Sequence, residues 1–262
     1  MRCDIDLTCL APAMRQAGAE ILRIKTGGVE ADYKADASPV TQADHASEAI
    51  LKAALAQFFP DIPVISEENT ESHLLSPTAR YFLVDPLDGT REFIRRDSNG
   101  HFTVNIGFIQ QGMACGGIIY VPAMDWLCWT DKNGRAHQER DGQHSLLQIR
   151  QVPKKGPAAL ASRSHRDPKT NAFLEAEAIT DIVSAGSSLK FLLLAAGMAD
   201  IYPRFGPTME WDTAAGEAIL RGAGGHIHTP DGQPHHYGKP GWKNGAFIAY
   251  AGYRPAFPLA RY

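Results

Sequence analysis

Residues 81–90 read YFLVDPLDGT, an apolar run that ends in two aspartates three positions apart. The aromatic and aliphatic residues before Asp85 predict a buried strand. A buried strand has no use for a carboxylate unless its charge is compensated, because an unpaired ion is costly to remove from water. Asp85 and Asp88 therefore need a partner.

Two other parts of the chain deliver carboxylates in a similar way. The run VISEEN places Glu67 and Glu68 directly after a short apolar stretch, and MEWDTAAGEAIL places Asp212 at the start of a helical pattern. Acids supplied by three separate strand or helix ends are typical of a site for a hard cation such as Mg²⁺, which takes oxygen ligands.

Each of these acids also has an ordinary structural interpretation. Asp212 fits the N-cap of a helix, the two glutamates fit a solvated loop, and Asp85, Pro86, Asp88 and Gly89 fit a type I or II turn. The turn explains Pro86 and Gly89, but it leaves Asp85 unpaired at the end of a buried strand. A bound cation removes that difficulty.

The residues that follow the second aspartate suit a phosphate. Gly89 and Thr90 begin the segment TREFIRR, which predicts a short helix whose first amides can bind an anion closely. Thr90, with another carboxylate behind it, would orient an attacking water, and Asp44 at the head of a predicted helix is a candidate, although it also fits an ordinary helix-start acid. Metal ions beside an anion-binding turn favour phosphoryl transfer to water.

Composition excludes several other classes of protein. A net charge of -3 over 262 residues provides no basic field for a nucleic-acid polymer. The four cysteines form no CxxC pair, which indicates free thiols. Asp4 and Asp6 interrupt the apolar core that a signal peptide needs, and no stretch approaches the roughly 18 apolar residues of a membrane span. We therefore expect a cytoplasmic protein, with peripheral association with the inner face of the cell membrane left open, as is the choice between monomer and homodimer.

Periodicity indicates the elements that must position the site. Helices are expected at residues 7–24 and 41–59, followed by strands at 63–66, 81–85, 102–110, 115–122 and 125–130. The polar segment 138–156 is the expected boundary between an N-terminal α+β half, 1–154, and a C-terminal α/β half, 155–262. In the second half we expect strands at 158–164, 181–186 and 200–205 that alternate with helices at 167–177, 189–198 and 213–222.

The motifs SEE, DPLDGT and EWDTAAG, in this order, resemble the inositol monophosphatase superfamily of lithium-sensitive, magnesium-dependent phosphatases over essentially the whole chain. The runs FTVNIGFI, ASRSH, GSSLKF and ADIYPRFGPTMEWDTAAGEAIL resemble its CysQ branch of 3'(2'),5'-bisphosphate nucleotidases. The resemblance implies an α/β (α+β) fold, the layered α/β/α/β/α sandwich. It also implies removal of the 3'-phosphate of adenosine 3',5'-bisphosphate, a by-product of sulfate assimilation, to give AMP and phosphate.

The resemblance also implies roles for individual residues. Two or three Mg²⁺ ions would be held by Glu67, Asp85, the Leu87 carbonyl, Asp88 and Asp212. Substrate would contact Glu67, Leu87, Asp88, Gly89, Thr90, Lys190, Arg204 and Asp212. Glu67, Thr90 and Asp44 would be the catalytic residues, with Thr90 and Asp44 activating the water, while Glu68 would lie behind the ligands.

Substrate choice depends on fewer residues. A second phosphate needs a cation, which Lys190 or Arg204 would supply. As alternatives, Lys190 merely sits in the first turn of its helix and Arg204 in a loop ion pair. Residues with similarly open roles are Arg163 and His165 for charge, and Tyr202 and Trp211, which fit either an adenine contact or the core.

Two other functions remain compatible with these motifs. One is a phosphatase for inositol monophosphate or another sugar phosphate, and the other is a non-catalytic sensor that binds nucleotide. The histidines between 226 and 236 lie in a turn-like segment without an acidic or thiol companion, so we expect no zinc site there.

Overall fold

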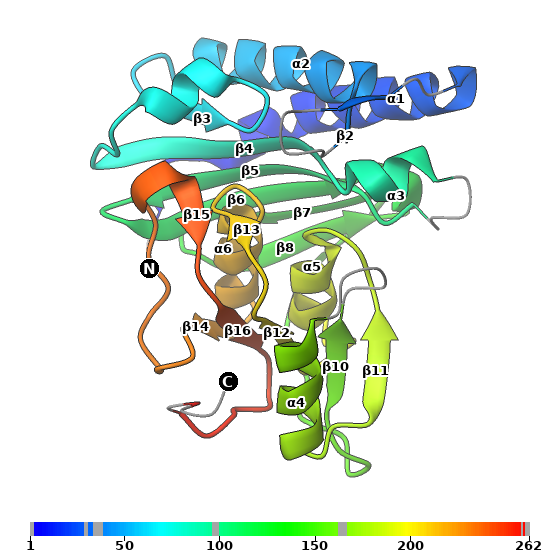
Figure 1. Cartoon of the computed structure of the whole chain (residues 1–262). Helices are drawn as coiled ribbons and strands as arrows, with labels where there is room; N and C mark the ends of the chain where they lie inside the picture. Colours follow the sequence, from blue (N-terminus) through cyan, green and yellow to red (C-terminus); the bar gives the residue numbers. More distant parts are fainter. Residues whose placement is uncertain are drawn as a thin grey trace.

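Helices and sheets alternate in five layers (Figure 1). The computed structural model describes residues 3–28, 31–33, 39–95, 100–161, 167–257 and 259. Helices α1 (Ala11–Gly27) and α2 (Gln42–Phe58) cover one face of a seven-stranded sheet, and α5 (Leu189–Ala195) and α6 (Ala214–Gly222) separate it from a five-stranded sheet. Helix α4 (Pro168–Ala176) packs on the far side of that second sheet. The expected α/β/α/β/α sandwich is confirmed.

The larger sheet has its strands in chain order. They are β3 (Val64–Ser66), β4 (Arg80–Asp88), β5 (Thr103–Gln110), β6 (Met113–Val121), β7 (Trp126–Thr130), β8 (Ala136–Arg140) and β9 (Gln143–Leu146). Only the β3 and β4 pair is parallel among these strands. Apolar side chains of β4, β5 and β6 pack against α1 and α2 in one buried cluster, so β4 and β5 form a rigid base for the residues that follow them.

The smaller sheet belongs to the second half of the chain. Its order is β11 (Asp181–Ser184), β10 (Ala158–Ala161), β12 (Ile201–Arg204), β16 (Phe247–Tyr250) and β14 (His226–His228). Strand β10 is parallel to both of its neighbours, whereas β16 is antiparallel to both of its own. The chain passes from one sheet to the other between residues 146 and 158, where the sequence predicts the boundary. Whether the two halves are separate domains stays a prediction.

Short elements complete the chain. Strands β1 (Ala31–Tyr33) and β2 (Pro39–Thr41) form a pair of three residues each. Strands β13 (Thr208–Met209) and β15 (Lys243–Asn244) form a pair of two residues each. Helix α3 (Thr90–Ile94) follows β4, and 3-10 turns occupy Leu7–Leu10, Thr70–Leu74, Pro122–Met124 and Pro240–Trp242. None of the helices in the described ranges is long and apolar enough to cross a membrane. The four cysteines are free, as expected.

The sequence misses strands wherever apolar alternation is absent. Strand β9 and the end of β8 lie inside the polar segment 138–156, which the sequence predicts to be a boundary. Every residue of β9 is exposed, so no alternation marks it. Asp141 and Gly142 between them both have positive φ, as a two-residue hairpin turn requires. Strand β14 likewise lies in a segment that the sequence indicates to be turn-like. The helix expected at 189–198 ends at Ala195 because Gly197, with φ +67°, terminates it.

Helix α6 lies unusually close to the larger sheet. Gly107 on β5 and Gly117 on β6 are directly paired, and both face the first turn of α6. A Cβ atom at Gly107 would lie 2.8 Å from the Ala215 nitrogen, and one at Gly117 would lie 2.8 Å from the Ala215 Cα. The missing side chains therefore make room for the helix that follows Asp212.

Replacing Gly117 with alanine should destabilise the protein, because the new methyl group meets helix backbone that cannot rotate away. We expect a loss of about 1–3 kcal/mol in the free energy of unfolding, measured by urea denaturation. Gly27→Ala is the matched control, since no atom lies within 4 Å of a Cβ at that exposed helix end. Equal stability of the two variants would contradict the close packing of α6.

Candidate active site

Three carboxylates from distant parts of the chain converge. Glu67 follows β3, Asp85 lies in β4, and Asp212 precedes α6. One oxygen from each lies within 4.8 Å of the other two. Asp85 is 1% exposed, and the other two are half-buried. This spacing suits a shared cation, because without one the three negative charges repel each other.

Asp85 has an oxygen without a partner. The strand continues to Asp88, with a bulge between the two aspartates in its pairing with β5, so the simple turn interpretation is wrong. The Leu87 amide donates to Asp85 Oδ1 at 3.1 Å, whereas Oδ2 is buried and has no hydrogen-bond partner in the described part of the chain. Burial raises the pKa of Asp85 well above its ordinary range, and the charge of Glu67 adds to the rise.

Asp88 lies beside this group and is held by the second half of the chain. Ser188 donates to Asp88 Oδ2 twice, from its amide at 2.6 Å and from its hydroxyl at 2.7 Å. Ser187 Oγ lies 2.9 Å from the Asp88 carbonyl. Burial raises the pKa of Asp88, while the Lys190 charge and the Ser188 hydrogen bonds oppose the rise. The serines thus leave one Asp88 oxygen for another ligand.

Asp212 is not a helix cap. The N-cap position of α6 is Thr213, which makes no side-chain cap bond, so the N-cap interpretation of Asp212 is wrong. Instead, Asp212 Oδ2 accepts from the upstream Met209 amide at 2.8 Å. Burial raises the pKa of Asp212 well above its ordinary range, and the charges of Asp88 and Glu67 contribute further.

A hydrogen-bond chain runs from α2 to the start of α3. Thr90 Oγ1 donates to Asp44 Oδ1 at 3.1 Å, and Asp44 Oδ2 accepts from the Thr41 amide and hydroxyl, both at 2.7 Å. Asp44 is therefore both the capping-box residue of α2 and a hydrogen-bond partner of Thr90, while its role toward a water stays a prediction. Between Asp88 and Thr90, Gly89 has φ +90°, and a Cβ there would lie 3.1 Å from the His101 carbonyl. No side chain fits at that position.

A pocket of about 370 Å³ lies against Glu67, Asp88, Thr90 and Asp212, whereas Asp85 and Asp44 are not part of its described wall. Its walls include Glu67, Asp88, Gly89, Thr90, Arg91, Glu92, Ser187, Lys190, Tyr202, Arg204 and Asp212. The volume is that of a small-molecule site. Because both carboxylates and cationic side chains line it, the pocket suits a ligand that carries several negative charges together with a metal.

Lys190 and Arg204 supply the positive charge. Lys190 is 5% exposed, its Nζ donates to the Ser187 carbonyl at 2.7 Å, and it lies 5.0 Å from the centre of the Tyr202 ring. Burial lowers its pKa to about 8, against the pull of Asp88. Arg204 makes no ion pair with the residues described; its guanidinium donates to the Pro207 carbonyl at 3.1 Å, and its buried Nε has no hydrogen-bond partner. These contacts argue against the loop ion pair.

The remaining residues singled out by the sequence lie partly at the pocket and partly away from it. Glu68 lies outside the group of three carboxylates. Trp211 is buried and stacks on His73 with ring centres 4.9 Å apart, so it belongs to the core, whereas Tyr202 lines the pocket. Arg163 and His165 lie outside the described residues. The contacts of Ser188 were missed, although the motif GSSLKF had marked its segment.

The donor set fits a hard cation. It consists of carboxylate oxygens, one of them buried without a partner, and it contains no thiol or imidazole. Mg²⁺ and similar ions prefer such oxygen ligands. Chemically, the pocket can hold a cation, an anionic ligand and a water oriented by Thr90.

Comparison with known proteins agrees with this geometry. The model of the Inositol monophosphatase family matches residues 6–253. The chain belongs to this family. The 3'(2'),5'-bisphosphate nucleotidase CysQ of Escherichia coli (strain K12) is 42% identical over 226 residues, which cover 85% of this chain and 90% of that protein. The CysQ of Shigella flexneri is 43% identical with the same coverage.

Solved structures support the fold independently. The crystal structure of CysQ from Bacteroides thetaiotaomicron, a bacterial member of the family, has a TM-score of 0.76 and 33% identity, covering 94% of this chain and 97% of that one. The inositol monophosphatase TM1415 of Thermotoga maritima has a TM-score of 0.73 at 21% identity, over 92% of this chain and 90% of that one. The second likeness concerns the fold alone.

The raised pKa of Asp85 makes metal-free stability depend on pH. A carboxyl whose folded-state pKa is raised stabilises the fold below its unfolded pKa of about 4, and this stability is lost as pH rises through the folded value. Asp85→Asn removes this loss, so at pH 8 with a chelator its Tm should exceed that of the wild type by at least about 3 °C. The variant should also lose most of the rise in Tm that Mg²⁺ causes.

The measurement is differential scanning calorimetry between pH 5 and pH 8, with chelator or Mg²⁺. Asp141→Asn is the matched control, because Asp141 is exposed in a hairpin turn. Parallel Tm profiles for wild type and Asp85→Asn would contradict the assignment of a costly buried charge to Asp85.

Proposed function

We propose that the protein is a magnesium-dependent 3'(2'),5'-bisphosphate nucleotidase. It would hydrolyse the 3'-phosphate of adenosine 3',5'-bisphosphate to AMP and phosphate. The observation that carries the proposal is the convergence of Glu67, Asp85 and Asp212 beside a pocket with two cationic side chains. The printed name of the CysQ relatives points to the same substrate.

The ligands of the metal would come from both halves of the chain. Two or three Mg²⁺ ions would be held by Glu67, Asp85, the Leu87 carbonyl, Asp88 and Asp212. When bound, the ions supply positive charge that polarises the phosphate and lowers the pKa of water. The unpartnered Asp85 oxygen and the Asp88 oxygen left free by Ser188 support these assignments.

Thr90 and Asp44 would orient the water. Because the Thr90 hydroxyl donates to Asp44, the lone pairs of its oxygen are available to accept a hydrogen bond from a water in the pocket. The water oxygen would then form a bond to phosphorus while the bond to the 3'-oxygen breaks. Asp44 is 1% exposed and is absent from the pocket wall as described, so it would act through Thr90.

The start of α3 would hold the scissile phosphate. Gly89 adopts the left-handed conformation that turns the chain from β4 into the helix, and the first amides of a helix have no acceptor within it. With Thr90, Gly89 lies in the pocket wall next to Asp88. A phosphate placed there would lie beside both the metal ligands and the residue that orients the water.

The second phosphate would meet Lys190 and Arg204. Arg204 has a buried Nε without a partner, which an anionic oxygen would satisfy. Lys190 keeps its positive charge best below pH 8, since burial has lowered its pKa to about 8. Tyr202 lies next to Lys190 in the same wall, which also contains Phe191, and its ring is a candidate contact for a nucleotide base.

Location and assembly are less constrained. A cytoplasmic location and the choice between monomer and homodimer stay predictions. Nothing in the described part of the chain supports the peripheral membrane association that the sequence left open.

Phosphate release by the purified protein tests the proposal. With Mg²⁺, adenosine 3',5'-bisphosphate should be hydrolysed in strong preference to inositol 1-phosphate and fructose 1,6-bisphosphate. Asp88→Asn should lower turnover by at least about 100-fold, since outer contacts of metal ligands alone are worth about 10–100-fold. Its fold should persist, because Asn keeps the shape that Ser188 recognises.

Controls separate the metal site from substrate choice. Lys190→Met should raise KM for the nucleotide bisphosphate more than for a monophosphate, and Asp141→Asn should behave as wild type. Preference for inositol 1-phosphate would overturn the substrate while keeping the metal site. Stoichiometric nucleotide binding without any release of phosphate would instead favour the sensor.

A further inference from the structure

The segment that carries Asp212 is supported from behind by a strand pair. Strand β13 pairs with β15 in the register Thr208 to Asn244, and the Glu210 amide donates to the Trp242 carbonyl at 2.8 Å. The chain then turns sharply through Asp212 into α6. Because this turn is irregular, its conformation must be maintained by side-chain contacts.

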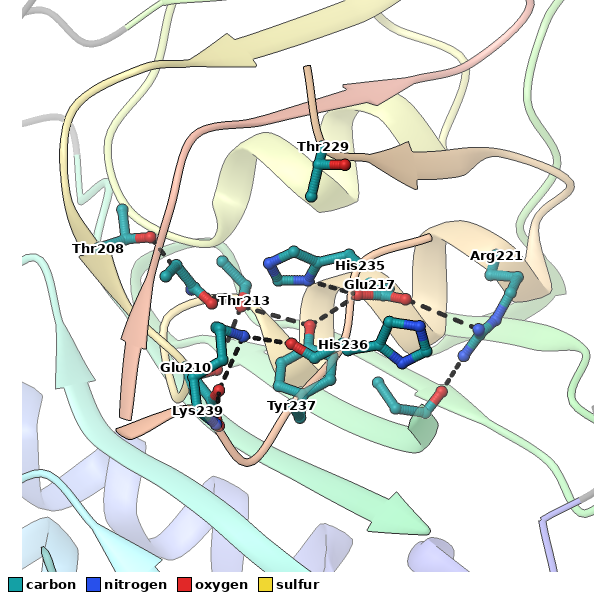
Figure 2. Close-up of polar contacts among 12 residues, drawn as sticks. Thr208, Glu210, Thr213, Glu217, Arg221, Thr229, His235, His236, Tyr237 and Lys239 are labelled. Atoms are coloured by element: carbon teal, nitrogen blue, oxygen red, sulfur yellow. Dashed lines mark hydrogen bonds and ion pairs between the residues drawn. The ribbon is translucent and has the colours of Figure 1, made fainter. Parts of the chain in front are cut away.

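Glu210 provides the first set of contacts. Its carboxylate is fully buried and accepts from the amides of Gly238 and Lys239 at 2.8 and 2.9 Å. It also accepts from Lys239 Nζ at 2.7 Å (Figure 2). Its backbone carbonyl accepts from the amides of Thr213 and Ala214 at 3.2 and 3.1 Å. One residue thus ties the turn around Asp212 to the loop at 236–239.

Asn244 provides the second set. Its Nδ2 lies 2.7 Å from the Met209 carbonyl and 3.0 Å from Thr213 Oγ1. Met209 in turn donates its amide to the Asp212 carboxylate. The amide side chain therefore holds the two residues that flank the Glu210–Asp212 stretch.

A buried group of side chains around the Glu217 carboxylate holds the other side of the 236–239 loop. Tyr237 donates its hydroxyl to Glu217 Oε2 at 2.7 Å, and His235 Nδ1 lies 3.1 Å from the same oxygen (Figure 2). Glu217 also lies 3.6 Å from Arg221 one turn along α6. The loop that Glu210 binds is consequently anchored to the same helix that follows Asp212.

We propose that Glu210 and Asn244 are positioning residues for Asp212, which set the orientation of its carboxylate toward the metal. This inference rests on the proposed function, in which Asp212 is a metal ligand. Both side chains are buried, and neither belongs to the described pocket wall, so they would act through Met209 and Thr213 rather than by touching substrate. Removing such supports typically weakens metal binding about 10–100-fold.

The test is a thermodynamic cycle in the metal-binding energy. Glu210→Gln keeps the shape but presents an amide NH₂ to a backbone N–H, which breaks one contact to the 236–239 loop. Mn²⁺ is titrated and the free ion is followed by electron paramagnetic resonance, in the wild-type and Asp212→Asn backgrounds. Metal-free Tm is measured for each protein. Lys239→Met is the control, since it removes the half-buried cation and leaves both backbone amides in place.

We expect Glu210→Gln to weaken Mn²⁺ binding about 10-fold in the wild-type background and less than about 2-fold when Asp212 is already Asn. Lys239→Met should change the affinity less than Glu210→Gln does. If Glu210→Gln does not fold, Asn244→Ala provides the same comparison, because it removes the donor to Met209 and Thr213.

Two results would overturn the inference. An equal loss of affinity in both backgrounds, or a lower metal-free Tm with unchanged affinity, would show that these residues only stabilise the fold. If instead Asp212→Asn binds Mn²⁺ as tightly as the wild type, the assignment of Asp212 as a metal ligand is wrong, and so is the role of Glu210 that depends on it. The affinity of the Asp212→Asn protein therefore tells the two failures apart.

Discussion

The repulsion among three carboxylates, one buried and two half-buried, that converge from separate parts of the chain is the constraint on which this structure depends. Glu67, Asp85 and Asp212 bring oxygens within 4.8 Å of one another, and burial alone already raises the pKa of Asp85 and Asp212. Such a group is unfavourable in a metal-free protein unless it takes up protons, and it becomes favourable when a cation replaces them. The surrounding contacts nevertheless hold the three carboxylates close together. In an ion pair the two charges attract each other, whereas these charges repel and are held by other parts of the fold, as in a binding site.

Those contacts come from both halves of the chain. Ser188 of the second half binds Asp88 of the first, although the two residues are 100 positions apart. The paired glycines Gly107 and Gly117 of the first half admit the helix that follows Asp212 of the second. The site therefore forms only when the two halves pack together, and a change in their packing would alter the positions of Asp88 and Asp212.

Local sequence signals were enough to pick out the three carboxylates that converge in the structure, but not the residues that hold them in place. An apolar run that leads into Asp85 is unusual in itself, so most of β4 and its acids could be predicted, although the strand continues to Asp88. The bonds of Ser188 and Glu210 arise from tertiary contacts across many residues, and no spacing reveals them. Strand β9 could not be predicted for a different reason, because an exposed edge strand has no alternation of apolar and polar residues. The N-cap interpretation of Asp212 failed because its carboxylate turns back to Met209 rather than toward the helix.

The central claim is that a divalent cation binds between Glu67, Asp85 and Asp212. It is tested most directly by anomalous diffraction from crystals grown with Mn²⁺ in place of Mg²⁺. The account predicts a strong anomalous peak within bonding distance of these three carboxylates, with additional density beside Asp88 if more than one ion binds. Well-ordered carboxylates without a peak among them, or Mn²⁺ bound only elsewhere on the chain, would contradict it.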